Sequence, residues 1–532
     1  MKRERWVGLV FISIAVALII VDSTIVNVAI PAIIDDIGVT STEVQWIQES
    51  YTLVFAAFLL LFGALADRYG RRLVMLLGIA VFAASSIAAA LADSGTALIL
   101  ARLVQGLGGA AILPTTLSLI NANFQGRERG IAFAVWGSTI GGMAAVGPLL
   151  GGWLTTDFSW RWAFGINIPL GILIIIGVLL FVPESRAEHD RPIDWAGAAI
   201  SVVAAGSIVF GLIEGRTYGW WTVEEAPVIG GWEWPWELSP IPFAFALGLV
   251  FVAIFVLRAR SRHRAGKPVL LTPELFGIRS FRNGNVAAAI VSLGEFGIIL
   301  ALPLWLQNAL GYTALQTGWI LVALAGGSFV ASGLASALIS RFSALATVRM
   351  GIAAEIAGLV ALGLVISVDT PWWAIAGSLA VYGFGVGLAT AQLTNVVLAD
   401  VPVARSGEAS GTQSTARQLG AALGVAVLGT VLFSSLELDL QQRLDGSPYA
   451  DEAVAAVVDS AGAAIPAIEA QSAEAADAAR ASLSTATAYS AYAAAGFLSL
   501  GLVSTLGLSS GRRERDDEVP AEEQGAPATT AD

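Results

Sequence analysis

Several carboxylates and arginines lie in stretches of the sequence that are otherwise apolar enough to cross a membrane. Asp22 stands near the middle of the run from Trp6 to Ile34, and Glu295 and Glu355 stand in two later runs. A charge at the centre of a membrane helix costs about 2.5–3.5 kcal/mol on insertion scales, so such residues usually face a cavity or a partner and are functional. A carboxylate in this setting can take up and release a proton. We therefore interpret Asp22 as a proton site of a membrane transporter.

An internal repeat relates Glu295 to Asp22. At one constant offset, residues of the first half recur as the same residue types in the second half: Gly38, Thr40, Trp46 and Gly78 fall on Gly311, Thr313, Trp319 and Gly351. The same offset places Glu295 at the position of Asp22. Parallel repeats of this kind are the plan of alternating-access carriers. We expect each half to present one carboxylate, at similar depth, across a central cavity.

Arg102 and the residues near it could complete the chemistry. Arg102 and Gln105 lie in one apolar run, and Glu49 enters a neighbouring run from the same side at similar depth. Arg102 is expected to pair with Glu49 or to reach Asp22, and a purely structural ion pair is the alternative. Glu355 is expected to bind a cationic substrate or to pair with Arg417.

Composition defines the elements that must position these groups. Of the 532 residues, 56% are hydrophobic and 13% are charged, whereas a soluble domain carries about 25% charged residues. The chain has no Cys, which excludes disulfides and Cys-ligated metals, and both His lie in polar loops. No phosphate-binding Gly-x-x-x-x-Gly-Lys-Ser/Thr loop is present, so we expect no ATP, no metal and no cofactor.

Apolar runs predict an all-α polytopic membrane protein with fourteen spans, near 7–34, 44–66, 73–92, 96–119, 129–154, 163–182, 193–213, 241–257, 283–306, 314–340, 347–367, 372–396, 408–433 and 487–508. With the repeat, this gives two six-helix bundles, 1–192 and 283–510, and an inserted two-helix hairpin, 193–282. The segment 511–532 is expected to be a disordered cytoplasmic tail. Outer loops are expected at 214–240, which is Trp-rich, and at 434–486, which is Ala-rich with helices broken near Pro448 and Pro466.

Cationic residues fall almost entirely at alternate ends of the predicted spans. Only Arg161, Arg216, Arg443 and Arg480 lie at the opposite ends, and Arg102 and Arg417 lie within spans. Because Lys and Arg are retained on the cytoplasmic side, both termini are expected there.

The loop after the second span carries a dense pattern of glycines and charges: Gly63, Asp67, Arg68, Gly70, Arg71 and Arg72. Gly63 permits close helix approach and Gly70 a tight turn. Asp67 is placed to meet a helix N-terminus or an arginine. A simple positive anchor would need only the arginines.

The fifth span carries Gly147, Pro148, Gly151 and Gly152. Small residues at this spacing allow tight helix packing, and Pro148 permits a bend. Ordinary membrane packing explains much of this pattern.

Together these motifs resemble the major facilitator superfamily, and in particular its fourteen-spanning drug/proton antiporters. The resemblance rests on the Gly63–Arg72 loop, the Arg102–Gly106 segment, the Gly147–Gly152 motif, Trp160–Gly171 and Asp22–Pro31. It implies that the loop latches the cytoplasmic ends of the two halves in the outward-facing state, that Arg102 takes part in proton coupling, and that the fifth-span motif belongs to an exporter.

The sequence thus predicts a transporter rather than an enzyme, driven by the proton motive force. We expect proton coupling at Asp22, Glu295, Arg102 and Glu49, and substrate contacts at Asp22, Glu295, Glu355 and Gln105. The expected protein is a monomer of the cytoplasmic membrane that exports lipophilic, cationic small molecules and binds no nucleic acid. A dedicated exporter of one metabolite, antibiotic, lipid or siderophore is the alternative, and a non-transporting membrane scaffold is a third.

Overall fold

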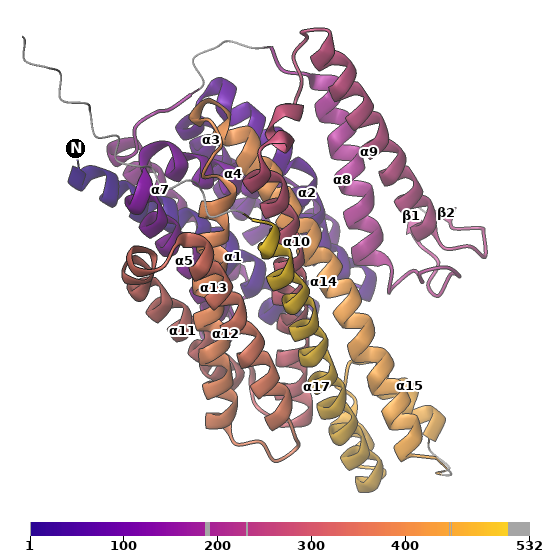
Figure 1. The fold of residues 1–532 in the computed structure, drawn as a ribbon. Helices are drawn as coiled ribbons and strands as arrows, with labels where there is room; N and C mark the ends of the chain where they lie inside the picture. The colour runs from indigo at the N-terminus through magenta and orange to yellow at the C-terminus, as the bar shows by residue number, and fades with distance from the viewer. Residues whose placement is uncertain (1, 187–191, 230–231, 446, 448–449, 509–532) are drawn as a thin grey trace, which may run out of the picture.

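A computed structural model describes residues 2–186, 192–229, 232–445, 447 and 450–508. Within these residues it is almost entirely helical (Figure 1). The helices are α1 Lys2–Ile37, α2 Ser41–Tyr69, α3 Arg71–Ala90, α4 Gly95–Asn123, α5 Gly126–Asp157, α6 Arg161–Gly165, α7 Asn167–Phe181, α8 Trp195–Glu214, α9 Pro240–Arg264, α10 Arg279–Leu304, α11 Ala314–Arg341, α12 Ala344–Val365, α13 Trp372–Val397, α14 Ser406–Arg443, α15 Ala450–Asp459, α16 Ile465–Glu469 and α17 Ala473–Ser504.

Short elements complete the described chain. They are β1 Val228–Ile229, β2 Trp232–Glu233, η1 Pro273–Gly277, η2 Trp305–Ala309, η3 Val403–Arg405 and η4 Thr505–Gly507. By length and hydropathy, the described part of the chain has 13 helices able to cross a membrane, or 14 when the bent α5 is counted as one span. The predicted polytopic all-α fold is therefore confirmed.

The helix starts show the internal repeat in their local chemistry. Thr40 caps α2 and Thr313 caps α11, and each forms a capping box with the third residue of its helix, Glu43 or Gln316. The glycines two residues before these caps, Gly38 and Gly311, both have left-handed backbone conformations, with φ of +63° and +71°. The repeat-related turns thus fold in the same way in both halves.

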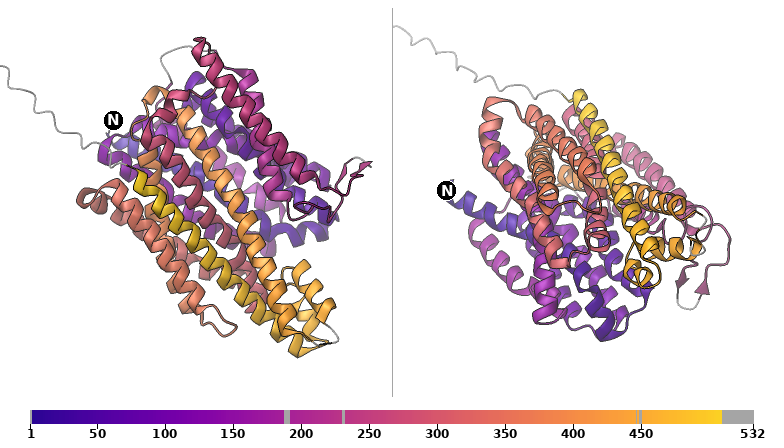
Figure 2. Two further views of the ribbon diagram at one scale, coloured as in Figure 1. Left: turned by 45° about the vertical axis from the view of Figure 1, so that its right-hand side comes forward. Right: turned by 90° about the horizontal axis from the view of Figure 1, so that it is seen from below.

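The helices form two bundles and an outlying hairpin (Figures 1 and 2). The first bundle packs α1–α7 together, and the second packs α10–α14 with α17. The hairpin of α8 and α9 lies to one side, where α8 packs on α2 and α9 packs chiefly on α8. The apolar face that α9 turns outward suits contact with lipid.

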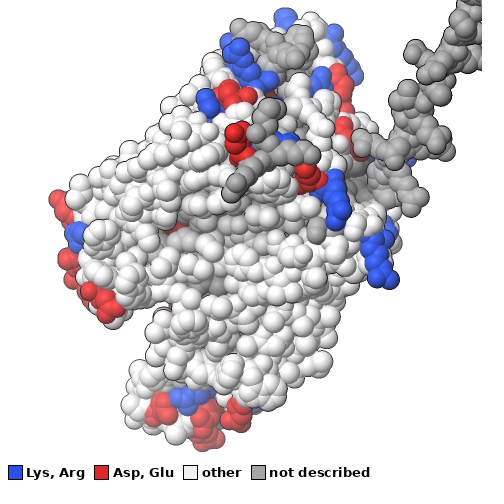
Figure 3. All heavy atoms as spheres, turned by 90° about the vertical axis from the view of Figure 1, so that its left-hand side faces the viewer, with Lys and Arg blue, Asp and Glu red and all other residues white. Residues whose placement is uncertain are grey.

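Charged residues gather at the two ends of the molecule, and an uncharged band separates them (Figure 3). We call the end with the α2–α3 turn at Gly70 the basic end, and the end with the α14–α17 connection, residues 444–472, the acidic end. Figure 3 shows a notch between two lobes on the side of the acidic end.

The predicted outer segments are ordered where the structure describes them. The Ala-rich segment contains the short helices α15 and α16 between α14 and α17, with a break before Pro466 as expected, whereas the break expected near Pro448 lies outside the described residues. α17 begins at Ala473, earlier than the predicted span, so it extends past the apolar stretch that predicted it. The Trp-rich segment folds into the β1–β2 hairpin. The predicted disordered tail, 511–532, lies outside the described residues.

Candidate functional site

Asp22 forms a closed polar cluster inside the first bundle. Its side chain is fully buried, and its Oδ2 accepts a hydrogen bond of 2.6 Å from Nη1 of Arg102. Its Oδ1 accepts hydrogen bonds of 2.7 Å from Nε2 of Gln105 and from Nδ2 of Asn167. Both oxygens are therefore satisfied, which offsets the cost of burying the charge.

Helix α4 positions Arg102 and Gln105 on one face, because residues three apart are neighbours on a helix. Nη1 of Arg102 also donates to Oε1 of Gln105 at 2.7 Å, and Nε donates to the Ile47 carbonyl at 3.0 Å. The ring of Tyr51 lies 4.2 Å from the guanidinium carbon. The cluster is thus fixed by α1, α2, α4 and α7 of one bundle.

The structure decides between the two partners expected for Arg102, which reaches Asp22 and not Glu49; Glu49 lies against Glu214 of α8. One expectation is corrected: Asp22 does not face a central cavity in this structure, because its partners enclose it within its own bundle. A helix-interior carboxylate with three donors in reach gains more from those hydrogen bonds than from exposure to a cavity.

A second polar cluster surrounds Glu295 in the other bundle. Oε1 of Glu295 accepts a hydrogen bond of 2.7 Å from Thr390 of α13, and Oε2 lies 3.7 Å from Nη2 of Arg417 of α14. The Tyr382 hydroxyl donates to the Glu295 carbonyl at 3.1 Å. Glu295 is 4% exposed and is held less tightly than Asp22.

Glu355 of α12 is fully buried near this cluster, and neither of its carboxyl oxygens has a hydrogen-bond partner among the residues that the structure describes. Glu295 and Arg417 are its charged neighbours. Arg417 forms its ion pair with Glu295, so the expected Glu355–Arg417 pair is absent from the described residues. Two carboxyl groups and one guanidinium therefore share this interior, whereas the cluster at Asp22 holds one of each.

The α2–α3 turn joins the two bundles at the basic end, as the latch pattern predicts. Asp67 accepts 2.8 Å hydrogen bonds from the backbone N–H groups of Gly407 and Glu408 at the start of α14. Arg71 donates to the same carboxylate at 2.7 Å and to the Val403 carbonyl at 2.5 Å. Asp67 thus meets both a helix N-terminus and an arginine.

The glycines of this turn have the expected roles. A Cβ on Gly63 would collide with the backbone of α14 at Gly407 and Gly411, so only glycine permits this approach. Gly70 has φ +114°, which favours glycine. Arg72 donates to the Val182 carbonyl at 3.2 Å, and the guanidinium of Arg68 stacks on its neighbour Tyr69 at 5.3 Å. Arg72 therefore binds within the first bundle.

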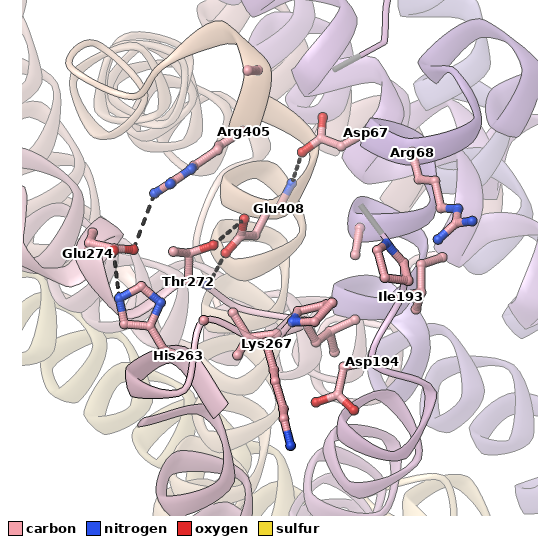
Figure 4. Close-up of a pocket in the computed structure, with 17 residues that line it drawn as sticks. Asp67, Arg68, Ile193, Asp194, His263, Lys267, Thr272, Glu274, Arg405 and Glu408 are labelled. Carbon is pink, nitrogen blue, oxygen red and sulfur yellow. Dashed lines mark hydrogen bonds and ion pairs between the residues drawn. The ribbon is translucent and has the colours of Figure 1, made fainter. Parts of the chain in front are cut away.

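A cavity of about 620 Å³ lies beside the latch, between α2, the hairpin and α14 (Figure 4). Glu408 accepts hydrogen bonds from the backbone N–H and the hydroxyl of Thr272, which ties the segment before α10 to α14. On the opposite wall, Asp194 caps α8 and binds Arg258 at 2.7 Å. Burial acts to raise the pKa of Asp194, but hydrogen bonds from Arg258 and from the Gly197 N–H outweigh it and lower the pKa.

Further polar contacts that the sequence analysis missed join the bundles at the basic end. Asn121 donates to the Ser406 hydroxyl at 2.7 Å, Arg129 donates to Asn395 at 3.0 Å, and Gln392 donates to the Gly130 carbonyl at 3.0 Å. These contacts hold the two bundles together at the basic end, whereas Figure 3 shows a notch between the lobes on the side of the acidic end.

The glycine motif of α5 packs this helix on α1. A Cβ on Gly147 would collide with Thr24, and a Cβ on Gly151 would press on Ile25, whereas Gly152 has open space. The parts of α5 before and after residues 144–145 meet at 42°. Pro148 explains the bend, because its ring clashes with the carbonyl four residues earlier.

Some functional residues had only weak signals in the sequence. Asn167 stands in the Trp160–Gly171 segment, but nothing in its spacing connects it to Asp22. Thr390 follows no motif. Glu214 lies at the boundary between a predicted span and an outer loop, so it reads as a surface residue until the fold places it against α2.

Comparison with known proteins identifies the family of this chain. A family model described as "Major Facilitator Superfamily" matches residues 12–425. The chain belongs to the major facilitator superfamily. The chain is 32% identical over 471 residues, 87% of this chain and 83% of the relative, to multidrug resistance protein Stp of Mycobacterium tuberculosis. It is 33% identical over 435 residues, 80% of this chain and 82% of the relative, to puromycin resistance protein pur8 of Streptomyces alboniger.

Among solved structures, the fold is similar to that of the human organic anion transporter MFSD10, with a TM-score of 0.58 at 14% identity. The match covers 94% of this chain and 98% of the other. At this identity the likeness shows the fold alone. This major facilitator chain is therefore a multi-pass membrane protein with the two-bundle architecture that its internal repeat predicts.

Proposed function

We propose that this major facilitator protein is a proton-coupled antiporter that exports lipophilic, cationic small molecules by alternating access. The observation that carries the proposal is the fully buried Asp22–Arg102 pair, which lies in one bundle opposite a carboxyl cluster in the other. Charged groups buried in a membrane protein mark ion and substrate pathways. The names of multidrug and antibiotic resistance proteins among its relatives favour export as the direction.

The basic end is proposed to face the cytoplasm, with both chain termini on that side of the cytoplasmic membrane. The latch contacts at Asp67 then hold the cytoplasmic side closed, and the notch is on the outside. In the transport cycle, proton binding from outside releases the substrate, and proton loss inside admits the next one. A potential of 100 mV adds about 2.3 kcal/mol for each charge that crosses.

Roles follow from how tightly each carboxyl group is bound. Asp22, Arg102 and Gln105 form the proton-coupling cluster of the first bundle, and Glu295 forms that of the second. Glu355, which has no partner of its own, is proposed to contact the cationic substrate. The monomer carries both bundles and is proposed to be the working unit, with the proton motive force as its only energy source.

Ethidium efflux in inverted vesicles with an imposed proton gradient tests this proposal, with wild type compared with Asp22→Asn. We expect wild type to move ethidium and Asp22→Asn to be inactive although inserted at the same level. Equal transport by both proteins would contradict the role of Asp22.

A dedicated exporter of one compound is the second candidate, because the Streptomyces relative is a resistance protein named for a single antibiotic, puromycin. A panel of unrelated lipophilic cations separates the two candidates. Transport of several cations supports the broad exporter, and transport of one compound alone supports the dedicated exporter.

A further inference from the structure

Two carboxyl groups meet where the inserted hairpin packs on the first bundle near the acidic end. Glu49 comes from α2 and Glu214 is the last residue of α8, and their carboxyl groups lie within hydrogen-bonding reach of each other. Glu214 is 2% exposed. The Oε2 atoms of both residues are buried and accept no hydrogen bond from a described donor. The inserted hairpin thus brings a polar group of its own to α2.

No cation of the described chain acts on this pair. Trp46 and Phe210 stack beside it with ring centroids 6.4 Å apart, and Tyr218 lies 6.3 Å from Phe210. Among the described titratable groups, Tyr218 and Glu225 face the pair. Arg216 is bound elsewhere: its guanidinium lies 3.1 Å from the Phe433 ring centroid, and Glu224 and Asp459 are its charged neighbours.

An ionised carboxylate can only accept hydrogen bonds, so two ionised carboxylates cannot bind each other. A carboxyl–carboxyl hydrogen bond needs a proton on one of the two groups, as in other carboxyl pairs that titrate as one unit. We propose that Glu49 and Glu214 form a proton-binding site in which a single proton joins α2 to the inserted hairpin. This site is separate from the clusters at Asp22 and Glu295, and the proposal does not rest on export.

The location of the pair gives the proton a structural consequence. Directly after Glu214, Arg216 contacts Phe433 of α14, and Thr217 accepts a 3.2 Å hydrogen bond from Gln45 of α2. The end of α8 therefore touches both bundles near the acidic end. When the proton leaves, two buried anions repel each other at this junction, and α8 is expected to separate from α2.

Infrared spectroscopy of the full chain in lipid tests the site directly, because a protonated carboxyl group has a C=O stretching band that a carboxylate lacks. Spectra would be recorded across a pH titration for wild type, Glu49→Gln, Glu214→Gln and the control Glu237→Gln, an exposed glutamate of the same outer segment. We expect one titrating C=O band to be lost in both pair variants and kept in the control.

The proposal is overturned if the pair variants keep every titrating band of wild type. It is also overturned if the carboxylate bands of the pair respond to sodium and not to pH, since the pair would then hold a metal cation.

Amide hydrogen exchange gives a second readout that does not require transport or full stability of the variants. In wild type, we expect exchange at the end of α8, around residues 209–214, to rise more steeply with pH than the chemical exchange rate alone. In Glu214→Gln, in which the side-chain amide donates to Glu49 at every pH, the excess is expected to vanish. An identical excess in both proteins would rule out a shared proton as its cause.

Discussion

Arg102 donates to Asp22 across 2.6 Å with both side chains buried, at 2% and 0% exposure. The pair is electrically neutral and completed by Gln105 and Asn167. Any proton that binds Asp22 therefore neutralises the anion to which these three donors bind. This makes proton binding a structural event within the first bundle, because the arginine that loses its anion has to find another partner.

Replacement of Asp22 by Asn is expected to destabilise the protein by about 3–5 kcal/mol, because it leaves the guanidinium of Arg102 buried without its anion. Thermal unfolding in detergent, followed by Trp fluorescence, measures this change. The double variant Asp22→Asn/Arg102→Gln removes the unpaired charge and should recover most of the lost stability without recovering proton-driven transport. Recovery of transport as well would show that the pair is only structural.

Glu295 and Glu355 are expected to respond differently to substitution. Glu295→Gln leaves Arg417 without its ion-pair partner and should cost several kcal/mol by the same argument. Glu355→Gln removes a carboxyl group that has no hydrogen-bond partner, so its effect on stability should stay within about 1 kcal/mol. Parallel unfolding curves test this, and a larger loss in Glu355→Gln would contradict the described geometry.

The latch predicts a change in the distance between the bundles. Asp67→Asn weakens the bonds to Arg71 and to the N–H groups that begin α14, so the basic end should open more often. Because the chain has no Cys, spin labels can be placed on single cysteines at the exposed positions Leu73 and Phe342. We expect longer label distances in Asp67→Asn.

Asp93→Asn, in an exposed turn between α3 and α4, serves as the control for the label experiment. It should leave the label distances as in wild type. An unchanged distribution in Asp67→Asn would mean that the other contacts at the basic end, such as Asn121 to Ser406, hold it closed on their own.

We call the hydrogen bond between Arg258 of α9 and Asp194, which caps α8, the hairpin lock. Its contribution to stability depends on pH through the carboxyl group of Asp194. Hydrogen bonds from Arg258 and Gly197 N–H hold its pKa below the ordinary value, so its stabilising effect is fully present above about pH 4. It is lost only as the pH falls through the lowered pKa. Asp194→Ala also removes the cap of α8 and should cost about 1 kcal/mol more than Asp194→Asn.

Amide exchange in the first turn of α8, at Gly197 and its neighbours, measures this lock. It should stay slow in wild type when the pH is lowered to the ordinary Asp range, after correction for the chemical rate. Fast exchange already at neutral pH in wild type would contradict the lock.

The sequence predicts the fold well because length and apolarity identify membrane helices. The internal repeat adds matching residues in the two halves, such as Thr40 and Thr313. The sequence predicts the latch well because the turn, its glycines and Asp67 are contiguous in the chain. The partners of the buried charges are predicted less well. Two carboxylates, Asp22 and Glu49, lie at a depth similar to that of Arg102. The rotation of the helices about their axes makes Asp22 the partner, and sequence spacing does not define that rotation.

Contacts between distant segments were beyond reach for the same reason. Asn167 and Thr390 act through packing of helices that no local pattern pairs, and Glu214 lies at a helix end that hydropathy alone assigns to a loop. Where a residue's partner is within a few positions, as for Arg71 and Asp67, the chain itself sets the geometry. Where the partner is a hundred positions away, the packing of the helices in the bundle sets the geometry.

Helix α14 is one unbroken helix that begins in the latch at Gly407, carries Arg417 and reaches Phe433 beside the hairpin. At 1.5 Å per residue, Arg417 lies about 15 Å along the helix axis from Gly407 and about 24 Å from Phe433. The helix can therefore work as a lever with its fulcrum at the buried ion pair. A 1 Å shift of Gly407 when the latch opens would swing Phe433 by roughly 1.6 Å in the opposite sense. A rigid helix of this kind would give opposite motions at the two ends of the molecule, which is the mechanical requirement for exposing one side while sealing the other.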